Sequence, residues 1–480
     1  MKRQNLHFLT VICCSILISA CASRPGISTR KFRQQVAESP VFETNFTGFA
    51  LYDTERQEMV YTYQADKYYT PASNTKIFTL YASLKLLGDS IPALEYRISG
   101  DSLLFTGTGD PTFLHPDINA LDTTYDQQVY QFLKSSEKQL VYVPRPTEDA
   151  YFGPGWAWSD YNFYYSPEKS VFPIYANVLR FHFMEGFNKP LVSPDFFTSY
   201  IEGFPDPDAP YSVFRKQHEN YFSYAPKEDT LSFDRDVPFI QSAELTTRLL
   251  ADTLHKNVQL MKQWPQVPEL QMASVTEVST DSAQAALITF ETQPQKHFPV
   301  FTHRLYSLPV DSVYKQMMHS SDNFFAEQLL MLCSSVFQDT LSTEWTIDYV
   351  KKHYLSDLPD EPIWRDGSGL SRYNLQTPRG IVALLQKVDK ELSDERIKDI
   401  FPAGGKSGTV ESWYANPEGG APFVFAKTGT LSNKSALSGF IYTKSGKKLI
   451  FSFLHNNYIT STFPLKKEME KILQDIYLNY

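Results

Sequence analysis

Hydrophobic and polar residues alternate over residues 46–52 and again over 59–63, and the turn-rich sequence Asp-Thr-Glu-Arg lies between the two stretches. A period of two is typical of strands, so this pattern predicts a β-hairpin. Apolar residues then recur at helical spacing over residues 77–87, and a glycine follows. Because glycine commonly ends a helix, we expect a hairpin that leads into a helix whose first turn begins at Ser73.

The pattern changes in the middle of the chain. Residues 96–299 scatter proline, glycine, aspartate and aromatic residues among short strand-like runs, without long helical patterns. Helical periodicity returns from Val310, strand patterns follow, and residues 464–477 have the spacing of an amphipathic helix. We therefore predict an α/β (α+β) protein in which one or two β-rich domains, residues 96–299, interrupt a domain formed by residues 40–95 and 300–480.

The N-terminal residues have the pattern of an export signal. A basic start precedes the apolar residues 8–20, which are too few to span a bilayer as a helix. The run ends in Ile-Ser-Ala-Cys and resembles a bacterial lipobox, in which the peptide is removed and the cysteine is lipidated. This resemblance predicts a signal peptide over residues 1–20, a lipidated tether over 21–39, and a periplasmic protein anchored to a membrane through Cys21. Ala22 after the cysteine favours the outer membrane, and the alternative is an ordinary secretory signal with an incidental cysteine.

Composition narrows the classes of function. The 480 residues are 42% hydrophobic and 21% charged, which is a globular composition, and the length favours more than one domain. A net charge of −9 without basic runs argues against a nucleic-acid partner. Aromatic residues reach 15%, which suits either a carbohydrate- or peptide-binding surface or an aromatic-packed, β-rich core.

The cysteines indicate neither an intramolecular disulfide nor a metal site. Two of the four cysteines lie in the predicted signal peptide and Cys21 is the predicted lipid site, so Cys333 has no partner for an intramolecular disulfide. Its neighbours are apolar, and we interpret it as a buried hydrophobic residue. No Cys/His cluster has metal-ligand spacing, so we expect neither a metal nor another cofactor.

The strongest candidate for chemistry is the Ser-x-x-Lys sequence formed by Ser73 and Lys76. Residues three apart share one face of a helix, so the serine hydroxyl and the lysine amine can meet. The helix N-terminus offers free backbone N–H groups, and its field, together with burial, lowers the pKa of a nearby lysine towards that of a usable base. The alternative is a serine that only caps the helix, beside an exposed lysine.

The same spacing occurs elsewhere in the chain and is weak as a motif by itself. Further copies begin, for example, at Ser28, Ser135, Ser166 and Ser445. These copies lie in polar or proline-containing sequence, so we expect all four at the surface. Only Ser73 follows a predicted hairpin and precedes an apolar helix.

A second polar triplet, Ser321-Asp322-Asn323, enters an apolar helical run in the second part of the interrupted domain. It can therefore lie at a helix start that faces a cleft. The alternative is a helix cap without a catalytic role.

A third motif, Lys-[Ser/Thr]-Gly, occurs twice near the C-terminus, in Lys406-Ser407-Gly408-Thr409 and in Lys427-Thr428-Gly429-Thr430. We expect the active-site strand to be an inner strand that borders the cleft and is followed by more sheet. Strand patterns flank Lys427 on both sides, whereas Lys406 lies in a glycine-rich lead-in. We therefore predict that Lys427 is the active-site lysine and that Lys406 is incidental.

The three motifs, in this order, resemble those of the penicillin-binding proteins. Ser73 and Ser321 are 248 residues apart, far more than in β-lactamases. This spacing is similar to that of the low-molecular-mass class C penicillin-binding proteins, the D-Ala-D-Ala carboxypeptidase/endopeptidase family S13. Further similar stretches are residues 107–112, 154–156 and 366–374. The resemblance implies a DD-peptidase-like transpeptidase domain, an antiparallel sheet flanked by helices, with a large insertion between the first two motifs.

The resemblance also implies a role for each motif. Ser73 is the expected nucleophile and Lys76 the expected proton acceptor. Ser321 would relay a proton, and Asn323 would bind a backbone amide of a peptide substrate. Lys427 would attract the terminal carboxylate of D-Ala.

The residues after this lysine would complete the binding site. Thr428 or Thr430 would add a hydroxyl beside Gly429, and the backbone N–H groups of Ser73 and Thr430 would form an oxyanion hole.

Two more residues are carried over from the same family. Asp160 resembles the acidic residue that receives the amino end of a diaminopimelate side chain, and Arg372 resembles the arginine that receives its carboxylate. The alternatives are a turn aspartate and a surface arginine. The chain departs from the family at Ser432 and Asn433, which leaves the fine substrate preference open.

The predicted protein is thus a serine DD-peptidase that cleaves D-Ala-D-Ala termini or D-Ala–diaminopimelate cross-links of peptidoglycan stem peptides, and β-lactams are its expected covalent inhibitors. A β-lactamase or esterase on the same scaffold is one alternative, and an inert cell-wall binding module is another. No dedicated glutamate motif for deacylation lies between the first two motifs, which argues against a β-lactamase. Intact motifs at all three positions argue against an inert module.

Overall fold

The computed structural model describes residues 29–118, 126–187, 189–204, 213–225, 232–262 and 301–480. The predicted signal peptide, the lipidation site Cys21 and the serine at position 28 lie outside these residues. Within the described part of the chain, no helix has both the length and the apolar character needed to cross a membrane.

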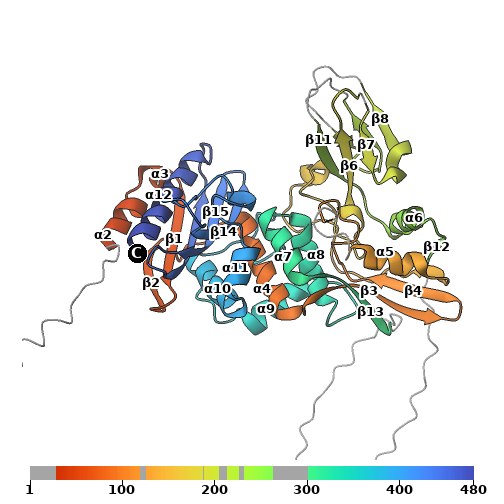
Figure 1. Ribbon diagram of the computed structural model, residues 1–480, viewed down its shortest axis with the longest axis horizontal. Helices are drawn as coiled ribbons and strands as arrows, with labels where there is room; N and C mark the ends of the chain where they lie inside the picture. The colour runs from red at the N-terminus through yellow and green to blue at the C-terminus, as the bar shows by residue number, and fades with distance from the viewer. Residues whose placement is uncertain (1–28, 119–125, 188, 205–212, 226–231, 263–300) are drawn as a thin grey trace, which may run out of the picture.

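One five-stranded antiparallel sheet joins the two ends of the described chain (Figure 1). Its strand order is β14-β15-β16-β1-β2, with β14 Val424–Leu431, β15 Lys434–Tyr442, β16 Lys448–Asn456, β1 Phe46–Asp53 and β2 Glu58–Tyr63. The first strand pairs with a strand near the C-terminus, so that Phe46 lies opposite Asn456. The predicted hairpin over residues 46–63 is confirmed. β14 lies at the edge of this sheet, so the expectation of an inner active-site strand was wrong.

Helices cover both faces of this sheet. On one face lie α2 (Thr29–Phe32), α3 (Pro40–Glu43) and α12 (Phe463–Asn479). On the other face lie α4 (Lys76–Leu86), α7 (Val310–His319), α8 (Asn323–Ser334), α9 (Thr343–Tyr354), α10 (Pro378–Glu391) and α11 (Asp394–Ile400). Alternate residues of the inner strands enter the two hydrophobic clusters, for example Phe451 on one side and Ile450 on the other.

The predicted tether does not extend through residue 39. Residues 29–37 form short helical turns, and the Phe32 side chain is fully buried and stacks on Tyr61 with ring centroids 5.4 Å apart. Val36 and Phe42 join the same cluster. Burial of these three apolar side chains fixes the segment to the sheet. The sequence pattern did not indicate this packing, because the three apolar residues lie among polar ones.

The inserted segment carries a second five-stranded sheet, in the order β12-β5-β4-β3-β13. Its strands are β3 (Ser90–Ser99), β4 (Ser102–Gly107), β5 (Gln139–Tyr142), β12 (Val258–Leu260) and β13 (His303–Pro309). Two small sheets stand beside it: β11 (Phe233–Pro238), β6 (Val178–Phe183) and β7 (Leu191–Ser193), and β8 (Ile201–Gly203), β10 (Phe222–Tyr224) and β9 (Val213–Arg215). The domain limits at residues 95 and 300 stay a prediction. β3 crosses the first limit, and it pairs with β13, which begins just after the second.

The segment is not as purely β as predicted. Helices α5 (Asp126–Ser135) and α6 (Ala243–Leu254) pack on its sheet within one hydrophobic cluster. Cys333, in α8, is fully buried, and burial raises the pKa of its thiol to about 12. A thiol in this state is not a nucleophile, which agrees with its interpretation as a core residue.

Candidate active site

The predicted nucleophile lies in a tight turn rather than in an α-helix. Ser73 belongs to the 3-10 helix η2 (Ala72–Thr75), and α4 begins at Lys76, so the α-helix starts three residues later than predicted. The turn and the helix start still place the two side chains on one face. The Lys76 Nζ atom lies 3.1 Å from the Ser73 Oγ atom, which confirms that the two groups meet.

The Lys76 amine is buried and held by two further acceptors. Its Nζ atom donates to Asn323 Oδ1 at 2.7 Å and to the Ser368 carbonyl oxygen at 2.8 Å. Burial lowers the pKa of Lys76 to about 8, although nearby carboxylates oppose this shift. When the amine is neutral, its two N–H groups are used by these two acceptors. Its lone pair then faces the Ser73 hydroxyl, as a general base requires.

A second lysine–serine pair lies beside the first. The Lys427 Nζ atom donates to Ser321 Oγ at 2.8 Å and to the Thr428 carbonyl oxygen at 2.9 Å. Lys427 is fully buried, and burial followed by the charge of Lys76 lowers its pKa well below the ordinary value. A carboxylate that enters the site would favour the charged form again, because opposite charges stabilise each other in a buried site.

Ser321 and Asn323, the two residues of the second motif that were predicted to act in the cleft, line it. Asp322 between them has another role. The Asp322 side chain accepts from Phe325 N at 3.1 Å and caps α8. Ser321 has a positive φ of 60°, and Asn323 donates from Nδ2 to the Tyr165 carbonyl oxygen at 2.9 Å. The helix-cap alternative therefore holds for Asp322 but not for its two neighbours.

Strand β14 packs directly against the turn that carries Ser73. Asn74 donates from Nδ2 to the Lys427 carbonyl oxygen at 2.9 Å. A Cβ atom on Gly429 would lie 2.6 Å from the Pro71 carbonyl oxygen and 3.1 Å from Ser73 N. Only glycine allows this approach, which explains the residue at this position of the third motif.

The two similar tetrads have different positions. Lys427 is fully buried in the cluster, whereas Lys406 is exposed in the turn before the short helix η6 (Gly408–Val410). Thr409 of the earlier tetrad nevertheless contributes to the cleft, although the sequence pattern did not indicate it. The Thr428 hydroxyl donates to the Thr409 hydroxyl oxygen at 2.7 Å, and both residues line the cleft.

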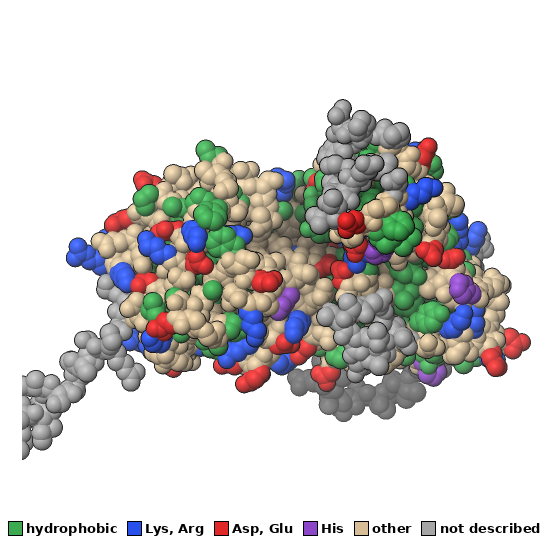
Figure 2. Space-filling model, turned by 45° about the horizontal axis from the view of Figure 1, so that its top comes forward, with side chains coloured by type: hydrophobic (Ala, Val, Ile, Leu, Met, Phe, Trp, Pro, Cys, Tyr) green, Lys and Arg blue, Asp and Glu red, His purple; other side chains and the backbone are tan. Residues whose placement is uncertain are grey.

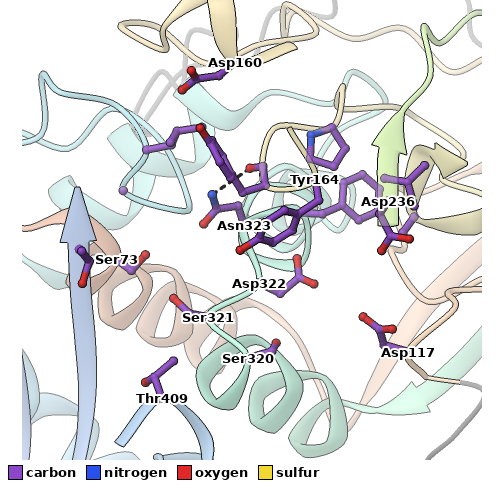
Figure 3. A pocket seen from close by; sticks show the side chains of 18 of the residues that line it. Ser73, Asp117, Asp160, Tyr164, Asp236, Ser320, Ser321, Asp322, Asn323 and Thr409 are labelled. Carbon is purple, nitrogen blue, oxygen red and sulfur yellow. Dashed lines mark hydrogen bonds between the residues drawn. The ribbon is translucent and has the colours of Figure 1, made fainter. Parts of the chain in front are cut away.

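These groups open into one cleft of about 650 Å³. The space-filling view is hollowed between the lobe of the first sheet and the lobe of the insertion (Figure 2). Figure 3 shows Ser73 and Ser321 near one end of the cleft, Asp160 above Asn323, and Asp117 and Asp236 at the far end. Among the described residues, no group of three or more His, Cys, Asp or Glu side chains is arranged to hold a metal ion.

The two predicted substrate-binding residues Asp160 and Arg372 line the same cleft. Asp160 is half-buried in the 3-10 helix η3 (Trp158–Asn162), and Arg372 is exposed in the loop before α10. Both act on the Tyr165 phenol, whose pKa burial raises, with Asp160 adding to the shift and Arg372 opposing it. Thr430 also lines the cleft, on β14. Its role in an oxyanion hole stays a prediction.

A buried acidic network behind Lys76 was not predicted. Glu327 Oε1 accepts from Ser368 N at 2.7 Å, and Asp366 accepts from Gly369 N at 2.9 Å and from Trp156 Nε1 at 2.9 Å. Burial, and then the charge of Asp366, raises the pKa of Glu327. These contacts fix the Ser368 carbonyl oxygen that binds Lys76. The only sequence signal was the polar, glycine-containing run 366–374, which does not reveal its contacts.

One of the other Ser-x-x-Lys copies contradicts its expected surface position. Ser166 is 1% exposed and Lys169 is 6% exposed, and the Lys169 Nζ atom donates to Asp149 Oδ2 at 2.7 Å. The Lys169 amine thus pairs with a carboxylate, and the Ser166 hydroxyl has no hydrogen-bond partner among the described residues, so these two residues do not form a serine–lysine pair. Ser135 is exposed at the end of α5, as predicted.

Comparisons with known proteins agree with this geometry. The family model "D-Ala-D-Ala carboxypeptidase 3 (S13) family" matches residues 29–189 and 249–475. The chain belongs to this family. The predicted family and the predicted class of enzyme, a peptidase, are confirmed.

Individual S13 relatives are similar at low identity. A D-alanyl-D-alanine carboxypeptidase of Actinomadura sp. (strain R39) is 26% identical over 473 residues, which is 92% of this chain and 83% of the relative. D-alanyl-D-alanine carboxypeptidase DacB of Haemophilus influenzae is 28% identical over 177 residues, 35% of this chain and 36% of that protein. The crystal structure of penicillin-binding protein 4 from Haemophilus influenzae has a TM-score of 0.68 at 20% identity, covering 94% of this chain and 99% of the other. The predicted fold class is confirmed.

The pH dependence of acylation follows from the state of Lys76. Only the neutral amine can accept the Ser73 proton, and the pKa of this amine is lowered to about 8. The second-order rate constant for acylation by a penicillin is therefore expected to rise about tenfold per pH unit below pH 7 and to level off above about pH 8. Stopped-flow measurement from pH 5.5 to 9 checks this profile. A rate that is flat, or that falls as the pH rises, would exclude Lys76 as the base.

Proposed function

We propose that the protein hydrolyses the D-Ala-D-Ala ends of peptidoglycan stem peptides through an acyl-enzyme on Ser73. The observation that carries the proposal is the convergence of two buried lysine–serine pairs on one cleft, Lys76 with Ser73 and Lys427 with Ser321. One pair can generate a nucleophile, and the other can deliver a proton and bind a carboxylate. The names of the S13 relatives, which are D-alanyl-D-alanine carboxypeptidases, support the same substrate.

In the first step, Lys76 takes the hydroxyl proton and Ser73 Oγ attacks the carbonyl carbon of the penultimate D-Ala. The oxygen of the tetrahedral intermediate is held by the backbone N–H groups of Ser73 and Thr430. When the C–N bond breaks, the terminal D-Ala leaves as an amine and receives a proton through Ser321. Water then hydrolyses the ester, and Ser73 regains its proton.

Substrate binding uses the edge position of β14. The outer edge of this strand borders the cleft, so an extended stem peptide can lie along it as an added strand. Lys427 and the hydroxyls of Thr428 and Thr430 would receive the terminal carboxylate, and Asn323 a backbone amide.

Asp160 and Arg372 lie on the same cleft with opposite charges. A diamino acid side chain that ends in an ammonium and a carboxylate would fit both of them. This end is free on an uncross-linked peptide. It is also free on the strand of a cross-linked dimer whose D-Ala carbonyl is attacked, whereas the corresponding amine of the leaving strand is in the scissile amide and is released by cleavage. We therefore include endopeptidase activity on D-Ala–diaminopimelate cross-links in the proposal.

We also propose that β-lactams acylate Ser73 and that the protein is held at the cell envelope by a lipid on Cys21, facing the periplasm. Penicillin-binding protein 4 of Haemophilus influenzae was crystallised with a β-lactam, which supports the first point. The lipobox-like sequence before Cys21 supports the second. Metabolic labelling with an alkyne fatty acid should mark the wild-type protein and not Cys21→Ala.

Chromatography of products tests the proposed activity. The purified protein should release D-Ala from a stem pentapeptide that ends in D-Ala-D-Ala, and it should split a cross-linked muropeptide dimer into monomers. A protein that turns over penicillin rapidly but leaves both peptides intact would be a β-lactamase instead. A protein that neither cleaves peptides nor reacts with penicillin would refute the catalytic proposal.

A further inference from the structure

The segment over residues 151–165 is unusually aromatic. Eight of its 15 residues are Phe, Tyr or Trp. Several of these rings are exposed rather than packed in the core: Trp158 is 77% exposed, Tyr164 63% and Phe163 50%. Large exposed rings grouped in one segment commonly mark a binding surface, because burial would otherwise be favourable.

Tyr164 lines the cleft, and Trp158 and Phe163 lie within two residues of residues that line it. Trp158 is in η3 together with Asp160, and both Asp160 and Tyr164 line the cleft that contains Ser73. Figure 3 shows Tyr164 beside Asn323 and below Asp160. In the neighbouring loop before α10, Tyr373 follows Arg372, which lines the same cleft, and is 63% exposed. We call Trp158, Phe163, Tyr164 and Tyr373 the aromatic rim.

Three rings of the aromatic rim, those of Phe163, Tyr164 and Tyr373, pack against neighbouring groups. Phe163 stacks on Tyr165 with centroids 5.4 Å apart and planes 4° apart, and Tyr164 meets the same ring edge-on at 5.5 Å. A Cβ atom on Gly155 would lie 2.6 Å from the Tyr373 ring, so this ring lies against the backbone there. Rings fixed in this way lose little conformational entropy when a ligand binds.

Polar side chains alternate with the rings. Ser159 and Asp160 follow Trp158, whereas the Asn162 side chain is already engaged by the Val213 carbonyl oxygen and by Arg215 N. A lipid or an apolar protein surface would remove water from Ser159 and Asp160 without replacing its hydrogen bonds. A pyranose sugar offers both of the matching features, because its C–H faces stack on aromatic rings and its hydroxyls form hydrogen bonds.

We propose that the aromatic rim binds the sugar that carries the stem peptide. This inference rests on the proposed function, which places the diamino acid of the peptide between Asp160 and Arg372. Two residues of a stem peptide separate that position from the sugar, and at about 3.3–3.6 Å per residue they span roughly 7 Å. Trp158 lies two residues from Asp160 in η3 and Tyr164 lines the cleft itself, so one substrate can reach both the cleft and the aromatic rim.

The test compares one stem pentapeptide with and without its disaccharide. Wild-type protein is expected to have the higher kcat/KM for the disaccharide form. In Trp158→Ala the ratio of the two kcat/KM values is expected to fall about tenfold, the size of one lost stacking contact. Phe463→Ala is the matched control, because Phe463 is a comparably exposed ring (56%) at the start of α12, and it should keep the wild-type ratio. An unchanged ratio in Trp158→Ala, or equal losses on both substrates, would overturn the proposal.

A binding measurement keeps this test separate from the proposed activity. Calorimetric titration of Ser73→Ala with the two pentapeptides should show tighter binding of the disaccharide form, and the added Trp158→Ala substitution should remove the difference. Equal affinities would refute the sugar site even if both peptides are hydrolysed. A sugar-dependent affinity without hydrolysis by the wild type would refute the proposed peptidase and leave the sugar site supported.

Discussion

Ser73→Ala is expected to lose covalent labelling by a fluorescent penicillin entirely and to lower D-Ala release by at least about 10⁴-fold. Among the described residues, Ser73 is the hydroxyl that contacts the Lys76 base. The Lys76 Nζ atom lies 3.1 Å from Ser73 Oγ, and its two other hydrogen bonds go to the amide oxygen of Asn323 and the carbonyl oxygen of Ser368. The substitution removes one oxygen from a half-buried position, so the fold should remain intact. A gel-based labelling assay and chromatography of the released D-Ala measure the two effects.

Ser135→Ala is the matched control for this experiment. Ser135 begins another Ser-x-x-Lys sequence, but it is exposed at the end of α5, and the Lys138 amine donates to the Gly100 carbonyl oxygen. Labelling and hydrolysis in Ser135→Ala should equal those of the wild type. Residual labelling of Ser73→Ala at the wild-type rate would show that the nucleophile lies elsewhere.

Lys427→Met is expected to lower the rate of acylation by about 10³-fold, whereas Lys406→Met should stay within about twofold of the wild type. Lys427 is fully buried and donates to Ser321, so its loss removes the group for the carboxylate and leaves the serine hydroxyl without its partner. Methionine fills nearly the same volume, which limits the damage to packing. Lys406 is exposed and outside the cleft.

Thermal unfolding of both variants separates a catalytic effect from a structural one. A buried lysine carries a desolvation cost, so Lys427→Met should unfold at a temperature close to that of the wild type or above it. A large loss of acylation at unchanged stability supports the assignment. Equal losses of acylation in Lys427→Met and Lys406→Met would show that the choice between the two tetrads was wrong.

Local periodicity predicted the elements that carry the motifs. The alternation that gave the β1–β2 hairpin and the spacing that gave α4 are properties of adjacent residues, and burial of one face enforces both. The same holds for the choice of Lys427, because strand patterns on both sides of this residue correspond to β14 and β15. Short segments were harder to predict. Phe32 and Val36 fix the N-terminal turns with few apolar residues in a polar stretch.

Features that depend on distant partners could not be read from the sequence. β14 lies at the sheet edge because β1 pairs with β16, about 400 positions along the chain, and no local pattern encodes that order. The contact between Thr409 and Thr428 and the burial of Lys169 against Asp149 have the same origin. Both arise where separate segments pack together, and each residue by itself has an ordinary polar neighbourhood.

The most direct test of the central claim is to locate the penicillin adduct in the wild-type protein. After reaction with benzylpenicillin and proteolysis, mass spectrometry should find one penicilloyl group, on the peptide that contains Ser73, and fragmentation should place it on that serine. An adduct on Ser321 or on any other residue, or a protein that remains unmodified, would contradict the proposed acyl-enzyme.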